Sequence, residues 1–334
     1  MAKEFKRLVF HKGSCDKNIP GPKLDRDLLN FQNISNWPSS LMVSLKKYFD
    51  EIIYLISVPN RRDARPPAIE HGIRYEVVPH SDLISKWINE CDVYFHRATP
   101  YIEPPTKPLS VYYSSGPNVK PEKYFNGWDV ILTSMFSGRP PNSNLGGNLY
   151  SWVKGDNDSF WCPAKVEKDF DFVVVGGHRK RIDHVKKLAK NYPNIKIATV
   201  GWGRWVYDHW EPKLVLSSIN NITEFGRGDH IYVRDILRRS KIGIAATQGI
   251  NEAFPMQTQM EYSLTGLYTV YGDTILEDGY YVNDKTGEKL SNIDVLKNWE
   301  ELGRGAREYA IKNFSSEVSA RCLMEIISSA RKKQ

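Results

Sequence analysis

Strand-length apolar runs recur along this chain of 334 residues, and helical patterns separate several of them. The run FDFVVVGG at 170–177 precedes the helical pattern HVKKLAKNY, and the pattern VRDILRRS precedes the run KIGIAAT at 241–247. Similar runs lie at 7–10, 51–58, 92–95, 109–113, 129–134, 195–201 and 267–272. Strands that alternate with helices form parallel sheets with covered faces, so the sequence predicts an α/β fold.

The length of the chain predicts two domains rather than one. The series of runs divides near residues 150–168, where the stretch SWVKGDNDSFWCPAKVEKDFD is rich in turn formers and charge. We therefore expect two Rossmann-like domains, 1–160 and 161–315. The tail is predicted to form amphipathic helices that break at Asn313 to Ser316, and the helix at 316–334 is expected to join the first domain.

Composition narrows the environment and the partners. The chain is 41% hydrophobic and 25% charged, as in ordinary globular proteins, and its formal charge of +7 favours anionic partners such as phosphates, nucleic acid or an acidic membrane face. Its four cysteines show no CxxC spacing, which favours reduced thiols and a cytoplasmic location. No apolar run approaches the roughly 20 residues of a membrane span, so we expect no transmembrane segment, although peripheral membrane contact stays open.

The run at 170–177 ends in Gly176 and Gly177, and the basic residues HRKR follow at once. Glycines let a ligand approach the backbone, and a helix N-terminus offers free amides and a positive dipole end to a phosphate. Cations disfavour such a helix start unless an anion offsets them, so the pattern favours an anion site. The alternative is a tight strand–helix turn with a solvated basic surface.

The stretch NEAFPMQTQMEYSLTGLYTV at 251–270 carries two glutamates before a strand. Glu261 is predicted to start a helical segment that Gly266 caps. A carboxylate in this position can accept paired hydrogen bonds from vicinal hydroxyls, as acidic residues that hold ribose do. The alternative is that Glu261 only satisfies backbone amides at the start of the helix.

Together these pieces resemble the donor-binding half of GT-B glycosyltransferases, most of all the retaining enzymes of family 4. The likeness rests on Glu252-Ala253-Phe254-Pro255, on Glu261 through Gly266, on WVKGDNDSFWCP at 152–163 and on KRID at 180–183. The resemblance implies two Rossmann-like domains with a deep interdomain cleft and a C-terminal helical segment. It also implies an acceptor-side first domain and a second domain that binds a nucleotide sugar.

By this resemblance the chain would move a sugar from a UDP- or GDP-linked donor to an acceptor hydroxyl, with retention, without a metal and without a cofactor. The residues with implied catalytic roles are His96, Arg179, Lys180 and Glu252. The residues with implied substrate-binding roles are Gly13, Gly177, His178, Arg181, Ala253, Phe254, Pro255, Met256 and Glu261. Among them, Glu261 would hold the nucleotide ribose, and Arg179 and Lys180 would neutralise the leaving diphosphate.

Several alternatives stay open. Glu252 and Glu261 enclose eight residues where the family has seven, and the spacing after Gly177 is shortened, so Arg181 can replace Lys180 at the diphosphate. The triplets at 25–27, 156–158 and 169–171 match the DxD metal pattern but are scattered as chance matches would be. The acceptor implied is a glycan or a lipid-linked precursor. The alternatives are a DNA glycosyltransferase that acts on hydroxylated bases and a non-catalytic nucleotide-binding Rossmann protein.

Overall fold

The computed structural model describes residues 4–14, 21–58, 63–79, 87–97, 103–114, 126–133, 144–176, 185–186, 188–201, 219–226, 228–245, 257–271, 280–282 and 289–332. These residues form two compact units. Unit 1 contains the described residues up to Asn157 and those from Phe314 onward. Unit 2 contains the described residues from Asp158 to Asn313.

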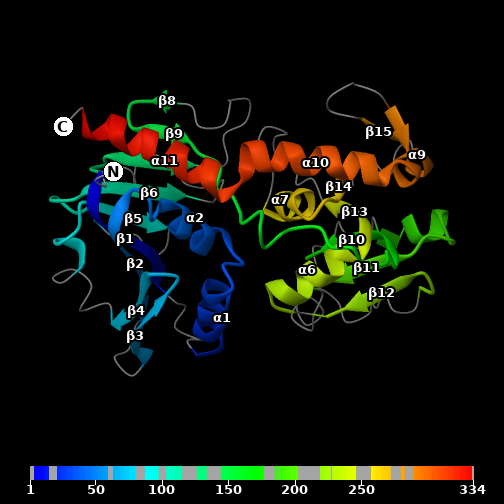
Figure 1. Ribbon diagram of the computed structural model, residues 1–334, viewed down its shortest axis with the longest axis horizontal. Helices are drawn as coiled ribbons and strands as arrows, with labels where there is room; N and C mark the ends of the chain where they lie inside the picture. Colours follow the sequence, from blue (N-terminus) through cyan, green and yellow to red (C-terminus); the bar gives the residue numbers. More distant parts are fainter. Residues whose placement is uncertain are drawn as a thin grey trace. The chain divides into compact units, whose positions relative to one another are not determined.

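Unit 1 is built on a nine-stranded sheet (Figure 1). Its strands lie in the order β3 (Arg65–Glu70), β4 (Ile73–Pro79), β2 (Phe49–Val58), β1 (Phe5–Ser14), β5 (Val93–Arg97), β6 (Leu109–Ser114), β7 (Val130–Thr133), β9 (Leu149–Ser151) and β8 (Asn144–Gly146). The edge strands β3 and β8 are antiparallel to their neighbours, and the other strands are parallel. The order β4-β2-β1-β5-β6-β7 is that of a Rossmann sheet, whose direction of winding reverses between β1 and β5.

Apolar side chains cover both faces of this sheet, as the continuous apolar runs predict for parallel strands. One face packs against α2 (Trp37–Leu45) and α11 (Ser316–Arg331), through side chains such as Leu41 and Leu323. Helix α1 (Gly21–Gln32) adds Phe31 to the same face. The opposite face is covered by Trp87, Ile88 and Trp128.

The break in the C-terminal helices lies where the sequence places it. Helix α10 (Trp299–Phe314) ends one residue before Ser315, which caps α11 through a hydrogen bond from the Val318 amide to its hydroxyl (3.4 Å). At this point the chain lies beside residues 155–157. The Asp156 amide donates to Phe314 O (3.0 Å) and the Ser316 amide donates to Asp156 O (2.8 Å). Helix α11 is therefore fixed to unit 1 at its first turn.

Unit 2 is built on a five-stranded parallel sheet (Figure 1). Its strands lie in the order β12 (Ile222–Phe225), β11 (Ile197–Val200), β10 (Phe170–Val175), β13 (Ser240–Ala245) and β14 (Tyr268–Tyr271). Helices α6 (His230–Arg238), α7 (Gln257–Leu264), α9 (Asn292–Lys297) and α10 belong to the same unit, as does a hairpin of β15 (Tyr280–Val282) and β16 (Lys289–Ser291). The winding reverses between β10 and β13, so both units have the Rossmann arrangement.

Cys91, Cys162 and Cys322 are free thiols in the described part of the chain. Burial raises the pKa of Cys91 to about 12, so this thiol stays protonated at neutral pH. None of the described helices combines the length and the apolar character that a membrane span needs.

Candidate functional site

The sheet of unit 2 splits at its carboxyl edge. Strands β10 and β13 pair only as far as Val173 and Gly243. On either side, β10 continues beside β11 to Val175, and β13 continues beside β14 to Ala245. The split therefore lies between the two strands at which the winding reverses. Open α/β sheets bind their ligands in the crevice at this position.

The Tyr262 side chain occupies the split. Its hydroxyl accepts a hydrogen bond from the Val175 amide (2.8 Å) and donates one to Ile244 O (3.3 Å). The residue is fully buried on α7, and its ring lies over β13. A Cβ atom at Gly243 would lie 2.3 Å from the Cδ2 atom of this ring. Tyr262 therefore links two strands that no longer bond to each other, and it has room to do so only because residue 243 is glycine.

Two glycines shape the backbone at the same edge. Gly176 follows β10 with φ +87°, and Gly201 follows β11 with φ +81°, which is the left-handed region that favours glycine. Their amides donate to Val200 O and Gly226 O, both at 2.8 Å. The strand-to-helix turn predicted after β10 begins here, and its basic residues lie outside the described part of the chain.

Glu261 lies on α7 next to Tyr262, with 8% of its surface exposed. The prediction that Glu261 starts this helix is wrong, because α7 begins at Gln257. The predicted cap is confirmed: Gly266 has φ +85°, its amide donates to Ser263 O, and the Leu267 amide donates to Tyr262 O, both at 3.0 Å. Glu261 therefore lies in the second turn of α7 rather than at its start.

Helix α10 holds the end of α7 in place (Figure 1). The Arg307 guanidinium donates to the carbonyl oxygens of Leu264, Trp161 (3.0 Å) and Asp158 (3.1 Å). Burial of this side chain lowers the pKa of Arg307. One turn earlier, Gly303 packs directly on the Gly266 carbonyl, where a Cβ atom would come within 2.1 Å of the oxygen. The position of α7, and hence of Glu261, is set by these contacts.

The carboxyl edge of unit 1 carries two buried histidines at the strands where its winding reverses. His11 on β1 and His96 on β5 share the last rung at which these strands pair. Their Nδ1 atoms lie 3.1 Å apart, and His11 also contacts the Tyr94 hydroxyl (2.7 Å) and the Ser57 hydroxyl (3.0 Å). Burial raises the pKa of Tyr94 well above its ordinary value, so the phenol is neutral. A hydrogen bond between the two rings requires a proton on one of these Nδ1 atoms.

Two cations lie close to this edge. The guanidinium of Arg97, at the end of β5, lies 5.1 Å from the ring centroid of Trp37, and the Lys154 ammonium lies 5.6 Å from the same centroid. Cation–π contacts of this kind hold positive charge over an aromatic face. They concentrate positive charge at the carboxyl edge of unit 1.

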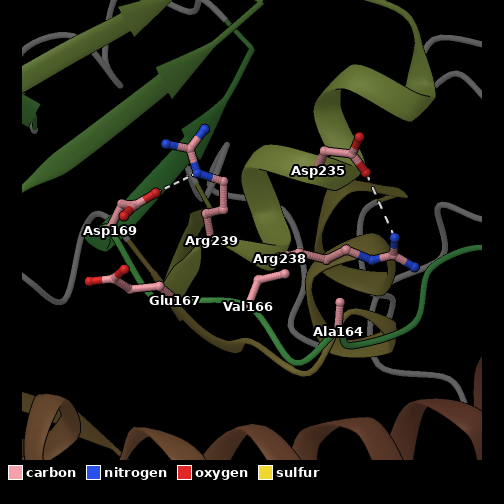
Figure 2. Close-up of a pocket in the computed structure, with 7 residues that line it drawn as sticks. All are labelled: Ala164, Val166, Glu167, Asp169, Asp235, Arg238 and Arg239. Atoms are coloured by element: carbon pink, nitrogen blue, oxygen red, sulfur yellow. Dashed lines mark hydrogen bonds and ion pairs between the residues drawn. The ribbon is translucent and has the colours of Figure 1, made fainter.

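A pocket of ≈ 340 Å³ lies at the other edge of the unit 2 sheet (Figure 2). Its lining residues come from the segment just before β10 (164–169) and from the end of α6, which places it at the amino edge. Four of the five charged side chains form ion pairs, Asp169 with Arg239 and Asp235 with Arg238 (3.7 Å). Asp171, the other carboxylate of this DxD triplet, pairs with Lys241 (2.7 Å). Because these charges neutralise each other away from the split, we do not place the functional site here.

Lys168 provides a test of the packing near this edge. Its ammonium donates to Arg238 O (2.6 Å) and Ser240 O (3.0 Å), and burial lowers the pKa of Lys168 to about 8, partly offset by Glu300. The folded pKa lies below the value of 10.5 in the unfolded chain, so the unfolded state holds more protons between pH 8 and 10.5. Stability from this group should rise across that window. A carbon-13 NMR titration of the lysine Cε atoms should show a transition with a midpoint near pH 8, and Lys168→Met should remove it. A midpoint near pH 10.5 for Lys168 would contradict the packing.

The structure describes three of the residues with implied roles. Gly13 lies in β1, and Glu261 lies beside the split in unit 2. His96 lies within β5 rather than after it, and it has no exposed surface. The remaining residues lie outside the described part of the chain: Gly177, His178, Arg179, Lys180, Arg181, Glu252, Ala253, Phe254, Pro255 and Met256. Tyr262 and His11 were not predicted; each stands one or two residues from a position that the sequence did single out.

Comparison with solved structures identifies the architecture. Sucrose-phosphate synthase from Thermosynechococcus elongatus is similar to this chain, with a TM-score of 0.58 and 10% identity. The match covers 98% of this chain and 100% of the synthase chain. AviGT4, a glycosyltransferase involved in avilamycin A biosynthesis, matches 99% of both chains with a TM-score of 0.58 and 14% identity. The chain has the GT-B glycosyltransferase fold.

Identities this low show the fold alone. No family model matches the sequence, and no curated protein matches it. The predicted fold class is therefore confirmed by the structure, while the choice of family 4 stays a prediction.

Proposed function

We propose that this protein is a glycosyltransferase that moves a sugar from a nucleoside-diphosphate sugar to an acceptor hydroxyl. The observation that carries the proposal is the split between β10 and β13, with the nearly buried Glu261 beside it on α7. A nucleotide fits this position for three reasons: it is the ligand crevice of a Rossmann sheet, it has a carboxylate for the ribose, and two left-handed glycines let phosphates approach. The GT-B fold over nearly the whole chain supports the same reading.

In the proposed reaction, the acceptor oxygen forms a bond to the anomeric carbon while the bond from that carbon to the β-phosphate oxygen breaks. The nucleoside diphosphate leaves with the electron pair, and its departing oxygen receives the proton of the acceptor hydroxyl on the same face, which gives retention. The rate depends on the stabilisation of negative charge as it develops on the diphosphate. In the proposal, the positive charges of Arg179 and Lys180, or of Arg181, stabilise the diphosphate, so no metal is required.

The proposed acceptor is a glycan or a lipid-linked precursor. The positive charge gathered near Trp37 in unit 1 suits an acceptor that carries phosphate. A duplex DNA acceptor is the rival, and a gel-shift titration against salt separates the two. DNA binding loses affinity steeply as salt rises, because each phosphate contact releases counterions.

A panel of nucleotide sugars tests the function directly. Many such transferases hydrolyse their donor slowly without an acceptor, so release of UDP or GDP from one member of the panel is expected. Release of the nucleoside diphosphate should persist in excess EDTA. Its rate should depend on the sugar of the donor as well as on the base. A protein that binds nucleotides but releases none with any donor or acceptor would be a non-catalytic nucleotide-binding protein.

Glu261→Ala is expected to weaken binding of the nucleoside diphosphate by about 1.5–3 kcal/mol, the usual loss for hydrogen bonds to a charged group. Glu261→Gln should recover part of that loss, because an amide oxygen still accepts one hydrogen bond. Isothermal titration calorimetry measures both. Glu301→Ala, on the exposed surface of α10, is the matched control and should bind as the parent does. Equal affinity for parent and Glu261→Ala would remove Glu261 from the site.

A further inference from the structure

We propose that Tyr262 is a positioning residue of the nucleotide site: it holds the split in the unit 2 sheet open and fixes the orientation of Glu261. This inference rests on the function proposed above. The residue needs no contact with the ligand. Its effect would come through the two strands that its hydroxyl links and through the helix that carries it.

The hydrogen bonds at the split support this role. Beyond Val173 and Gly243, β10 and β13 no longer pair, which exposes main-chain groups that would otherwise bond across the gap. The Val175 amide needs a hydrogen-bond acceptor, and the Ile244 carbonyl oxygen needs a hydrogen-bond donor. A phenol hydroxyl is both donor and acceptor, so one atom satisfies both strands at 2.8 and 3.3 Å. Tyr262 therefore stabilises a spacing of the two strands that is wider than direct pairing would allow.

Gly243 is the structural counterpart of this tyrosine. The Tyr262 ring lies so close to β13 that any side chain at residue 243 would meet it, at 2.3 Å for a Cβ atom. Glycine in the interior of a strand weakens the strand and often marks a site of close approach. Here the close approach is that of the ring. The two residues act together: the glycine leaves space for the ring, and the hydroxyl of that ring bonds to both strands across the split.

The anchor at Tyr262 also sets the angle of α7. The Tyr262 hydroxyl fixes the helix to β10 and β13, while Arg307 and Gly303 fix its C-terminal end. A helix held at two points cannot rotate about its axis. Glu261 is adjacent to Tyr262, so the direction in which its carboxylate faces depends on that anchor. Loss of the hydroxyl should therefore affect nucleotide binding more than it affects folding.

Tyr262→Phe tests this inference, because it removes only the hydroxyl. The matched control is Ser240→Ala, which removes a buried hydroxyl bonded to Ile236 O (2.9 Å) at the amino end of the same strand, β13. The probe is whichever of UDP and GDP the parent binds, titrated by calorimetry, with thermal unfolding measured in parallel. We expect both variants to lose some thermal stability. Only Tyr262→Phe should bind the nucleotide more weakly, by about tenfold, the effect of one lost hydrogen bond.

Three outcomes would overturn the inference: parental affinity in Tyr262→Phe, an equal loss of affinity in both variants, or a loss in Ser240→Ala alone. A parent that binds neither nucleotide overturns the proposed function, and this inference with it. Hydrogen exchange at the Val175 amide of the parent is independent of any variant. Slow exchange supports the bond to Tyr262, and exchange as fast as that of an exposed loop overturns it.

Discussion

Gly303→Ala is expected to lower the free energy of unfolding of unit 2 by about 3 kcal/mol, at the upper end of overpacking substitutions. The added Cβ would lie 2.1 Å from the Gly266 carbonyl oxygen and 3.1 Å from its carbon. This contact is with the backbone of a capped turn, so no side-chain rotation relieves it. Either α10 moves away from the sheet, which disturbs the packing of Trp299 and Leu302 against the core, or the turn after α7 shifts.

Gly305→Ala is the matched control, two residues further along the same helix. A Cβ atom at residue 305 meets no atom within 4 Å. Alanine favours a helix interior over glycine by roughly 1 kcal/mol, so this variant should be neutral or more stable than the parent. Urea unfolding followed by far-UV circular dichroism measures both. Similar stabilities for the two variants would show that α10 does not pack on the α7–β14 turn as described.

The Gly303→Ala substitution should also weaken binding at the proposed nucleotide site. A shift of the turn at Gly266 moves α7, which carries Glu261 and Tyr262. We therefore expect weaker binding of UDP or GDP in Gly303→Ala even at temperatures where it is fully folded. Gly305→Ala should retain parental affinity, which separates movement of α7 from a general effect of alanine in α10.

Gly155→Ala is the second substitution with a large expected effect, about 2–4 kcal/mol of lost stability in unit 1. Its Cβ would lie 2.2 Å from Ser315 O, 2.5 Å from Ser315 C and 2.8 Å from Phe314 O, all of them backbone atoms. These atoms belong to the segment that bonds to Asp156 immediately before α11. The substitution forces that segment away, and the hydrogen bonds of Asp156 with Phe314 and Ser316 are lost.

Hydrogen exchange followed by mass spectrometry gives the location as well as the size of this effect. Loss of protection should be largest in 152–157 and at the start of α11, where Trp152 Nε1 donates to Ser319 O (3.2 Å). Gly226→Ala, whose Cβ meets nothing within 4 Å, should leave exchange unchanged. Parental protection of α11 in Gly155→Ala would contradict the close approach at residue 155.

Most of the strands in the two large sheets were predictable, because burial on two faces requires continuous apolar runs. This holds for β10, β11, β13 and β14, whose runs in the sequence match the observed strands within a few residues. The break before α11 and the cap at Gly266 were predictable because local chemistry decides them. The strands β3, β4, β8, β9 and β12 were not predicted, since their sequences lack a long continuous apolar run.

The candidate site divides in the same way. Glu261 and the glycines after β10 have local signals, and the sequence singled them out. Tyr262 carries no such signal, because a tyrosine in a helix is ordinarily a core residue. Its role depends on Gly243, which is nearly twenty residues away and is brought under the ring by the β13–α7 packing. The pairing of His11 with His96 likewise requires β1 and β5 to be neighbours.

The sequence by itself therefore determined that the long apolar runs form strands, that helices alternate with them, and where two of the helices end. These features follow from the period of the apolar residues and from the residues at each turn, which act over a few positions. Tertiary structure alone decided the order of the strands, where the unit 2 sheet splits, and which side chain fills that split. Those features depend on contacts between residues distant in the chain, where a fraction of an ångström decides whether a ring, a hydroxyl or a Cβ atom fits.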